Sequence, residues 1–203
     1  MIIDLHVHTV DSRDSLIPLE DLIEQALSIG LDAVCLMEHN RLSEDDTAEL
    51  FANNTMLKIF RGVEVSSDLG HMLVYGITPQ QWQLFEGKAQ IYAQELVDSV
   101  RSWGGVCIPA HPFRFNSPSI GDKISSLVGV FAIEGYNGKT DINENLQAGE
   151  VAARLQLKVT GGSDAHMLGQ VGKCVTIFDE PIESIEELVT QLKAGTFQAR
   201  YLF

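Results

Sequence analysis

The stretch "IIDLHVHT", residues 2–9, alternates apolar and polar side chains. A β-strand directs alternate side chains to opposite faces, so Asp4, His6 and His8 would share one face and the apolar residues between them the other. Two imidazoles on one face can bind a metal ion, although a strand with its polar face in water has the same pattern. The stretch therefore predicts a first strand, and the remaining histidines must decide between these two interpretations.

Short apolar runs alternate with helical patterns along the rest of the chain. The runs typical of strands cover residues 2–8, 32–39, 57–65, 71–77, 105–111, 129–136, 157–164 and 174–178. The helical patterns cover residues 18–30, 43–53, 79–105, 142–156 and 184–195. Strands followed by helices favour a parallel sheet, and this many units favour an α/β barrel over an open doubly wound sheet. At 203 residues we expect a single domain over residues 1–203.

The charge balance limits the partners. With 14 Lys and Arg against 28 Asp and Glu, the formal net charge is -14, so long nucleic acid is an unfavourable partner. We expect a small anionic substrate only if metal ions or a few basic residues meet it. The sequence has neither a glycine-rich phosphate loop nor a dinucleotide fingerprint, and it lacks the G-x-S-x-G turn of serine hydrolases.

The cysteines and the first residues bear on location. Cys35, Cys107 and Cys174 lie in short apolar runs without Cys-x-x-Cys spacing, which predicts buried free thiols. The sequence starts without the pattern of a secretory signal, and no apolar run approaches the roughly 20 residues that span a bilayer. We therefore expect a cytoplasmic protein without a membrane partner. The sequence does not indicate its oligomeric state.

Histidines and carboxylates gather at the ends of the predicted strands. The six histidines are His6, His8, His39, His71, His111 and His166, and all but His71 lie at or just beyond the carboxyl end of a predicted strand or in the loop that follows. In a parallel barrel those ends meet at one rim. Glu64 and Asp164 would join them there. His71 starts its run, so it reaches the rim only if the chain folds back sharply through Asp68 and Gly70.

Such a cluster favours bound cations. Burying these imidazoles and carboxylates together without cations would cost several kcal/mol per uncompensated charge, against a total stability of about 5 to 15 kcal/mol. Mixed imidazole and carboxylate ligands suit Zn, Mn or Fe better than Ca or Mg. The sequence therefore predicts a metal site of this kind.

The motifs "DLHVHT", "RDS", "MEHN", "GVEVS", "GHMLVYG", "AHPFR" and "GGSDAH" resemble, in order and spacing, those of the PHP (polymerase and histidinol phosphatase) family of metal-dependent hydrolases. The resemblance covers nearly the whole chain and implies a distorted seven-stranded (β/α) barrel. It implies two or three divalent metal ions at three positions: His6, His8, Glu64 and Asp164; Glu64, His71 and His111; Asp14, His39 and His166. Glu64 would bridge the first two positions.

The sequence departs from the family pattern at three points. Glu38 replaces the aspartate that usually precedes that histidine, which would alter support of the ligands more than ligation. Ser15 follows Asp14 where many relatives have glycine, and Asp11 is a nearby alternative ligand. No polymerase module accompanies the domain, so we expect a free-standing enzyme.

The expected reaction is hydrolysis of a small phosphate ester by direct attack of metal-bound hydroxide. The candidate catalytic residues are Glu64, Asp164 and His166, the last two for proton transfer. Candidate substrate-binding residues are Arg114, a potential phosphate clamp or a surface arginine, together with Asn137, Arg13 and Lys173. The alternatives are a non-catalytic, metal-bound regulatory domain and an amide or lactone hydrolase. The alcohol part of the ester stays open between a nucleotide, a sugar, an amino alcohol and a nucleic-acid end.

Overall fold

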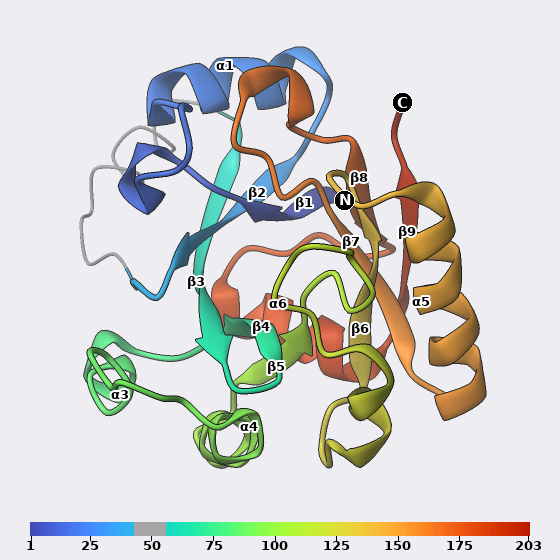
Figure 1. Ribbon diagram of the computed structural model, residues 1–203. Coiled ribbons are helices and arrows are strands. Elements are labelled where there is room, and N and C mark those ends of the chain that lie inside the picture. Colours follow the sequence, from blue (N-terminus) through green and yellow to red (C-terminus); the bar gives the residue numbers. More distant parts are fainter. Residues whose placement is uncertain (43–55) are drawn as a thin grey trace.

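The computed structural model describes residues 1–42 and 56–203 (Figure 1). The strands are β1 (Ile2–Val7), β2 (Ala33–His39), β3 (Lys58–Ser67), β4 (Gly70–Tyr75), β5 (Val106–Pro109), β6 (Ala132–Asn137), β7 (Lys158–Gly162), β8 (Cys174–Phe178) and β9 (Phe197–Tyr201). The α-helices are α1 (Leu19–Ser28), α3 (Pro79–Trp82), α4 (Ala93–Ser102), α5 (Ile142–Leu155) and α6 (Ile185–Ala194). Short 3₁₀ helices are η1 (Val10–Ser12), η2 (Gly121–Ser126) and η3 (Leu168–Gln170). The helix predicted over residues 43–53 lies outside the described residues.

A seven-stranded sheet in the order β5-β4-β3-β2-β1-β8-β9 forms the larger part of the fold. Strands β1, β2 and β3 are parallel, as predicted, but β4 is antiparallel to β3 and β5, and β8 is antiparallel to β1 and β9. The prediction of a parallel sheet is wrong for these strands. At β4 the reason is the connection, because two residues between β3 and β4 allow a hairpin but no crossover helix.

Strands β6 and β7 form a separate parallel pair. In space, β7 contacts β1 and β6 contacts β5, so this pair lies between the two ends of the curled strands β1 to β5. The structure confirms a mixed α/β fold with a curled seven-stranded sheet, but the closed barrel that we expected is not confirmed. Among the described residues, one isolated parallel β-bridge joins Val7 of β1 to Ala165, which follows β7.

A buried carboxylate occupies the place where β1 and β7 meet. Asp4 Oδ1 accepts hydrogen bonds from the backbone N–H of Ser163 at 2.8 Å and of His6 at 3.3 Å, and Oδ2 accepts from Gly172 at 2.8 Å. These donors are therefore satisfied by a side chain and not by a neighbouring strand. Burial, opposed by these hydrogen bonds, raises the pKa of Asp4 to about 6. Asp4 thus supports the backbone and does not act as a further ligand.

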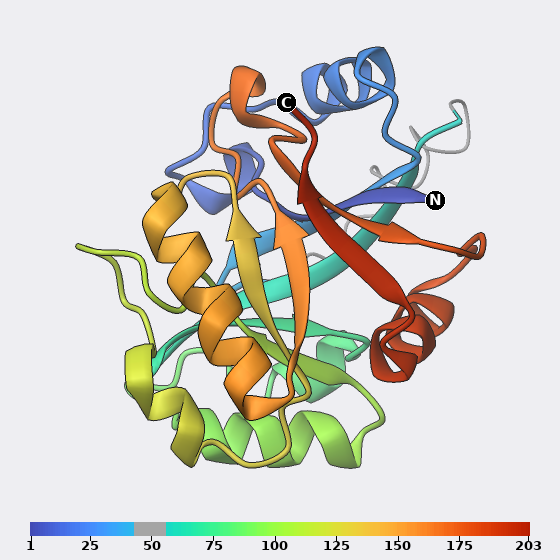
Figure 2. The same cartoon turned by 90° about the vertical axis from the view of Figure 1, so that its right-hand side faces the viewer.

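The helices cover the sheets with apolar faces. Figure 2 shows α5 lying across β6 and β7, where it buries Ala148, Val151 and Ala152. The predicted helix over residues 79–105 is wrong, because the chain forms two separate helices, α3 and α4. Gly87 between them has a φ of 74°, which a helix cannot accommodate. The sequence patterns did not indicate β9, a strand whose side chains are mostly exposed. No helix in the described ranges is long and apolar enough to cross a membrane.

Candidate metal centre

The carboxyl ends of β1, β2 and β3 bring their histidines and Glu64 to one end of the curled sheet. His71 joins them because the β3–β4 hairpin turns back through Asp68 and Leu69, and His71 pairs directly with Ser66 of β3. Since β4 runs opposite to β3, the first residues of β4 lie beside the last residues of β3. The sharp fold-back that the sequence required for His71 is confirmed.

One group of four potential ligands is fully buried. It contains His6, His8, Glu64 and Asp164, each with one ligand atom, and these atoms lie within 4.8 Å of one another. His8 Nε2 lies 2.9 Å from His6 Nε2, 3.2 Å from Glu64 Oε2 and 3.4 Å from Asp164 Oδ1. The four residues are those that the family resemblance assigns to the first metal position.

The donor atoms of this group are better placed to bind a cation than to hydrogen-bond to one another. Glu64 Oε2 is buried and takes part in no hydrogen bond of good geometry among the described residues. Two imidazole nitrogens that face each other at 2.9 Å can share only one proton. A divalent cation bound by both nitrogens and both carboxylates would satisfy all four atoms. The residues present therefore fit a metal ion.

Glu64 also contacts a second set of imidazoles. Its Oε1 lies 2.9 Å from Nδ1 of His71 and 3.1 Å from Nε2 of His111. Its Oε2 lies 3.0 Å from Nδ1 of His39, so that His39, Glu64 and His71 form another potential metal group. The two oxygens of Glu64 thus face different sets of nitrogens, as a bridging ligand requires.

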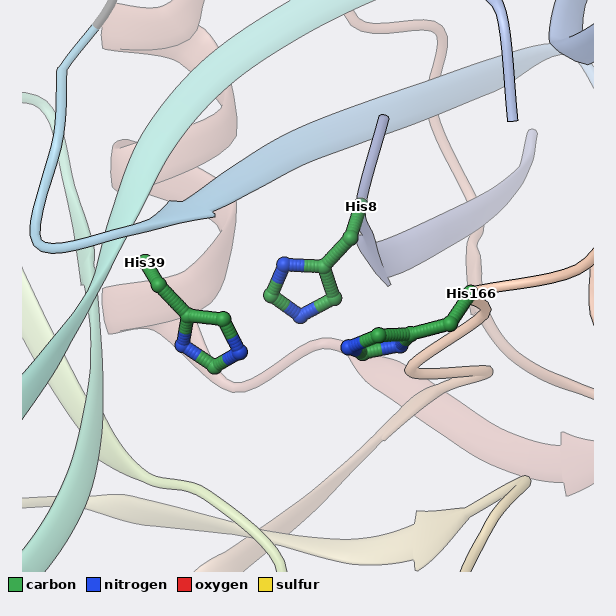
Figure 3. Close-up of side chains that lie close together, drawn as sticks. All are labelled: His8, His39 and His166. Atoms are coloured by element: carbon green, nitrogen blue, oxygen red, sulfur yellow. The ribbon is translucent and has the colours of Figure 1, made fainter. Parts of the chain in front are cut away.

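A third group consists of His8, His39 and His166, whose rings lie around a common space in Figure 3. Asp14 borders it, with Oδ2 at 3.3 Å from Nε2 of His39 and 3.1 Å from Nε2 of His166. Asp11, the alternative from the same loop, instead lies 3.8 Å from Arg41. The geometry favours Asp14 as the loop ligand. The structure thus brings every predicted ligand together, while the ligand roles themselves stay predictions.

Residues behind the cluster orient the imidazoles. Glu134 Oε1 lies 2.9 Å from Nδ1 of His6, on the ring side opposite the four-residue group. Such carboxylate–histidine pairs fix the tautomer and ring orientation of metal ligands. Glu134 is not among the residues predicted from the sequence. The available signal was an acid inside the apolar run "FAIEGY", the same signal that identified Glu64 in "GVEVSS".

The unusual Glu38 acts through a hydroxyl group. Glu38 is buried and accepts hydrogen bonds from Ser12 Oγ and, at 2.6 Å, from Thr9 Oγ1. Ser12 Oγ also lies 3.0 Å from Nδ1 of His8 and accepts from the backbone N–H of His39 at 3.2 Å. Glu38 therefore positions the His8 ring and the His39 backbone through Ser12, which is a supporting role and not ligation.

The carboxylates are held in their ionised form. Burial opposes ionisation of Glu64, but the His6 imidazole and a hydrogen bond from His111 hold the pKa of Glu64 well below its usual range. For Asp164, burial is likewise outweighed by His6 and His8, with a contribution from Arg114, and its pKa is also well below its usual range. Both groups therefore carry the charge that a cation needs.

The pKa values of His39 and His166 are shifted in the opposite direction to that of His6. Burial, and to a smaller extent the neighbouring His8 imidazole, lowers the pKa of His39 to about 4. Burial also lowers the pKa of His166. Burial would lower the pKa of His6 too, but Glu134 and Asp164 raise it well above its usual range. His39 and His166 are therefore neutral near pH 7, the state in which imidazole binds metals.

A polar rim adjoins Asp164. Arg114 Nη2 donates to Asp164 Oδ2 at 2.6 Å and to Asn137 Oδ1, and Arg114 Nε donates to Thr140 Oγ1 at 2.9 Å. The Asn137 side chain is buried and donates to Glu134 Oε2 at 2.9 Å. Arg114 is therefore held by these three residues and is not an exposed surface arginine.

The other basic candidates differ from Arg114. Arg13 is exposed, with a φ of 66° in the loop before Asp14, and the side chain of Lys173 packs near Gly138. Within the described part of the chain, neither side chain forms a hydrogen bond or ion pair with a predicted ligand. Lys139 is not among the residues predicted from the sequence, and its Nζ lies 3.2 Å from Nδ1 of His166. Its position in "YNGKT", two residues after Asn137, was the only available signal.

Several known proteins are similar to this chain. The family model described as PHP-associated matches residues 143–197. The uncharacterized protein MJ0417 of Methanocaldococcus jannaschii is 27% identical over 187 residues, which cover 89% of this chain and 71% of that protein. Among solved structures, PsfC of Pseudomonas syringae has a TM-score of 0.75 at 21% identity, covering 98% of this chain and 91% of its own.

Two further solved structures have the same fold. A two-domain protein of Bacteroides vulgatus that contains a predicted PHP-like metal-dependent phosphoesterase has a TM-score of 0.75 at 18% identity, over 99% of this chain and 64% of its own. An amidohydrolase of Chromobacterium violaceum, with bound sulfate and no metal, has a TM-score of 0.69 at 18% identity, over 99% and 98%. The family match and the shared fold support the predicted family. The family model covers residues 143–197, and the solved structures, at 18% to 21% identity, show the fold alone.

Proposed function

We propose that this protein hydrolyses a small phosphate ester with the help of divalent metal ions. The observation that carries the proposal is the contact between Arg114 and Asp164, at 2.6 Å. It places a guanidinium group, whose planar donors match phosphate oxygens, directly beside a predicted metal ligand. An anionic group bound there would lie against both the arginine and the metal centre.

The metal ions would be held by the predicted ligand set around Glu64. When bound, ions at such sites lower the pKa of a water molecule toward neutrality and neutralise charge on phosphoryl oxygens. Zn, Mn and Fe suit the mixture of imidazole and carboxylate groups, and two or three ions would fit the three groups of ligands.

Although the net charge of the chain is strongly negative, two basic side chains would lie close to the bound anion. Arg114 is 14% exposed and is held by Thr140, so its guanidinium group is already oriented. Lys139 is 33% exposed, and its Nζ lies 4.0 Å from Asp164 Oδ1. We propose that Arg114 binds the phosphoryl oxygens and that Lys139 adds positive charge at the same edge. Asn137 orients Arg114 through its side-chain oxygen.

His166 is the candidate for proton transfer to the leaving oxygen. It lies between Asp14 and Lys139, at the more exposed edge of the cluster. Its Nδ1 lies 2.9 Å from the backbone oxygen of Asp164, so Nε2, which faces Asp14, is the atom that would bind a metal ion or transfer a proton. Ligation and proton transfer compete for that atom.

A specific observation keeps an amide or lactone substrate as the second candidate. The amidohydrolase of C. violaceum shares the fold over nearly the whole chain, and its bound sulfate shows only that an anion binds to that protein. Because the same metals can activate water for either reaction, the substrate-binding residues must decide. Arg114 favours the phosphate ester.

The experiment combines metal analysis with a substrate panel. Purified protein reconstituted with Zn²⁺ or Mn²⁺ is assayed on phosphomonoesters, cyclic nucleotides, short oligonucleotides, amides and lactones. We expect turnover of phosphate esters, and a fall in kcat/KM of about 10- to 100-fold in Arg114→Ala, as for loss of a charged hydrogen bond. Arg154→Ala, an exposed arginine of α5, is the matched control and should leave kcat/KM unchanged.

Two results would reject the proposal. Turnover of amides or lactones without any phosphate ester would assign the protein to the other hydrolase class. Stable binding of metal with no turnover of any substrate would support the non-catalytic, regulatory alternative.

A further inference from the structure

Asn145 places an amide on the buried face of helix α5. Its side chain is 5% exposed, and it shares this face with the apolar residues Ala148, Val151 and Ala152. Asparagine is less favourable in a helix than alanine or leucine, and a buried amide costs free energy unless it is hydrogen-bonded. The partners of Asn145 therefore show what this amide holds in place.

The amide binds the backbone of Asn137, the last residue of β6. Asn145 Oδ1 accepts from the Asn137 backbone N–H at 3.2 Å, and Asn145 Nδ2 donates to the Asn137 carbonyl oxygen at 3.0 Å. A side-chain amide offers an acceptor and a donor side by side, so it matches both groups of one residue. These two bonds fix the end of β6 in the way that a neighbouring strand would.

A further contact fixes the amide itself. Asn145 Nδ2 also donates to the hydroxyl oxygen of Tyr201 in β9, at 2.8 Å. The Tyr201 ring lies edge-on to the ring of Tyr136, with centroids 5.1 Å apart and planes at 71°, an arrangement that aromatic pairs favour. Both N–H donors of the Asn145 amide and its oxygen are thus engaged, which favours one orientation of this side chain.

The side chain of Asn137 carries this constraint to the predicted substrate-binding edge. Its Oδ1 accepts from Arg114 Nη2 and, at 3.1 Å, from Thr140 Oγ1. The backbone N–H of Lys139 donates to the same oxygen at 2.9 Å. Thr140 Oγ1 in turn accepts from Arg114 Nε at 2.9 Å. The position of the guanidinium group therefore depends on the Asn137 oxygen, which depends on the backbone that Asn145 holds.

We propose that Asn145 is a positioning residue for substrate binding, and that it acts on Arg114 through Asn137. The inference rests on the proposed function, because it explains how the group that would bind the phosphoryl oxygens is held in place. An arginine that is already oriented loses less conformational freedom when the anion binds. Loss of the Asn145 amide should therefore weaken binding of the anion.

Binding of inorganic phosphate to the metal-loaded protein measures this effect without turnover. In Asn145→Ala the Asn137 backbone loses both partners, and we expect the Kd for phosphate to rise about five- to tenfold, as for lost hydrogen bonds. Tyr201→Phe keeps the ring and removes only the hydroxyl group, so we expect a rise of about two- to threefold. Gln147→Ala, at an exposed position of α5, is the control and should leave the Kd unchanged.

A double-variant cycle separates positioning of Arg114 from a general loss of structure. If Asn145 acts through Arg114, the combined variant Asn145→Ala and Arg114→Ala should bind phosphate no more weakly than Arg114→Ala alone. Effects that multiply would show that Asn145 acts independently of Arg114, and would overturn the inference.

Metal content is the second measurement on Asn145→Ala. Asn137 also donates to Glu134, but Glu134 is held in addition by the His6 ring and the His111 backbone. We therefore expect Asn145→Ala to contain as much metal per chain as the wild type. Loss of metal would show that Asn145 acts on the metal centre and not on Arg114.

The outcomes separate this inference from the proposed function. If Arg114→Ala leaves the affinity for phosphate unchanged and no phosphate ester is hydrolysed, the proposed function fails. If Arg114→Ala weakens phosphate binding while Asn145→Ala and Tyr201→Phe do not, the positioning role of Asn145 alone is wrong.

Discussion

Glu134 Oε1 lies 2.9 Å from Nδ1 of His6, a residue 128 positions away in the chain. The second oxygen of Glu134 accepts from the backbone N–H of His111 at 2.9 Å. One carboxylate on β6 therefore holds a side chain of β1 and the backbone that follows β5. In the described sheets β6 is hydrogen-bonded to neither β1 nor β5. The Glu134 side chain therefore links these three strands directly at the metal centre.

Substitution Glu134→Gln should weaken metal binding about 10- to 100-fold, the usual effect of removing such a support group. Glutamine keeps the size of the side chain but loses the negative charge that orients and polarises His6. Competition with a chelator of known affinity would measure the change. Glu150→Gln, an exposed position of α5, is the control, and equal affinities of the two variants would contradict the role of Glu134.

The two aspartates of the loop after β1 should differ in effect. Asp14→Asn removes a carboxylate that faces His39 and His166, so we expect the loss of one metal ion per chain or a clear loss of affinity. Asp11→Asn removes only an exposed partner of Arg41 and should change neither metal content nor stability by more than about 0.5 kcal/mol. Elemental analysis of the purified variants decides, and loss of metal in Asp11→Asn alone would reverse the assignment.

Gly162 is required by close packing at the metal centre. A Cβ atom there would lie 2.4 Å from Cβ of His6 and 2.9 Å from Glu134 Oε1, so Gly162→Ala should displace His6 and destabilise the fold by about 1 to 3 kcal/mol. Gly149→Ala is the matched comparison, since it lies within α5 and its Cβ would contact nothing within 4 Å. It should stabilise the protein by about 0.5 to 1 kcal/mol. Urea unfolding measures both, and equal midpoints would contradict the packing argument.

The three cysteines should be unreactive in the native protein. All are buried and free, and burial raises the pKa of each thiol well above its usual range. A raised pKa leaves less thiolate at pH 8 in the folded state than in the unfolded state, and thiolate is the reactive form. An aromatic disulfide reagent should therefore react slowly without denaturant and rapidly in guanidinium chloride. Rapid reaction of the native protein would show that a thiol is accessible.

Local sequence patterns were sufficient for most of the strands and helices in the described part of the chain. Strand runs such as residues 32–39 and 57–65 correspond to β2 and β3 because the buried side chains themselves produce the apolar pattern. The long pattern over residues 79–105 was misleading, since helical spacing continues on both sides of Gly87 while the chain turns there. The pattern also did not reveal β9, because an exposed edge strand has little apolar periodicity.

By itself, the sequence determined most of the strands and the residue types that suit a metal, since hydrophobic alternation and the chemistry of imidazole and carboxylate are local properties. Only the tertiary structure decided that β4 runs backwards and places His71 beside Glu64, that Glu134 supports His6, and that Lys139 lies at His166. These relationships depend on how distant segments pack, and a short side chain can contact any residue that packing brings within about 3 Å, whatever their separation along the chain.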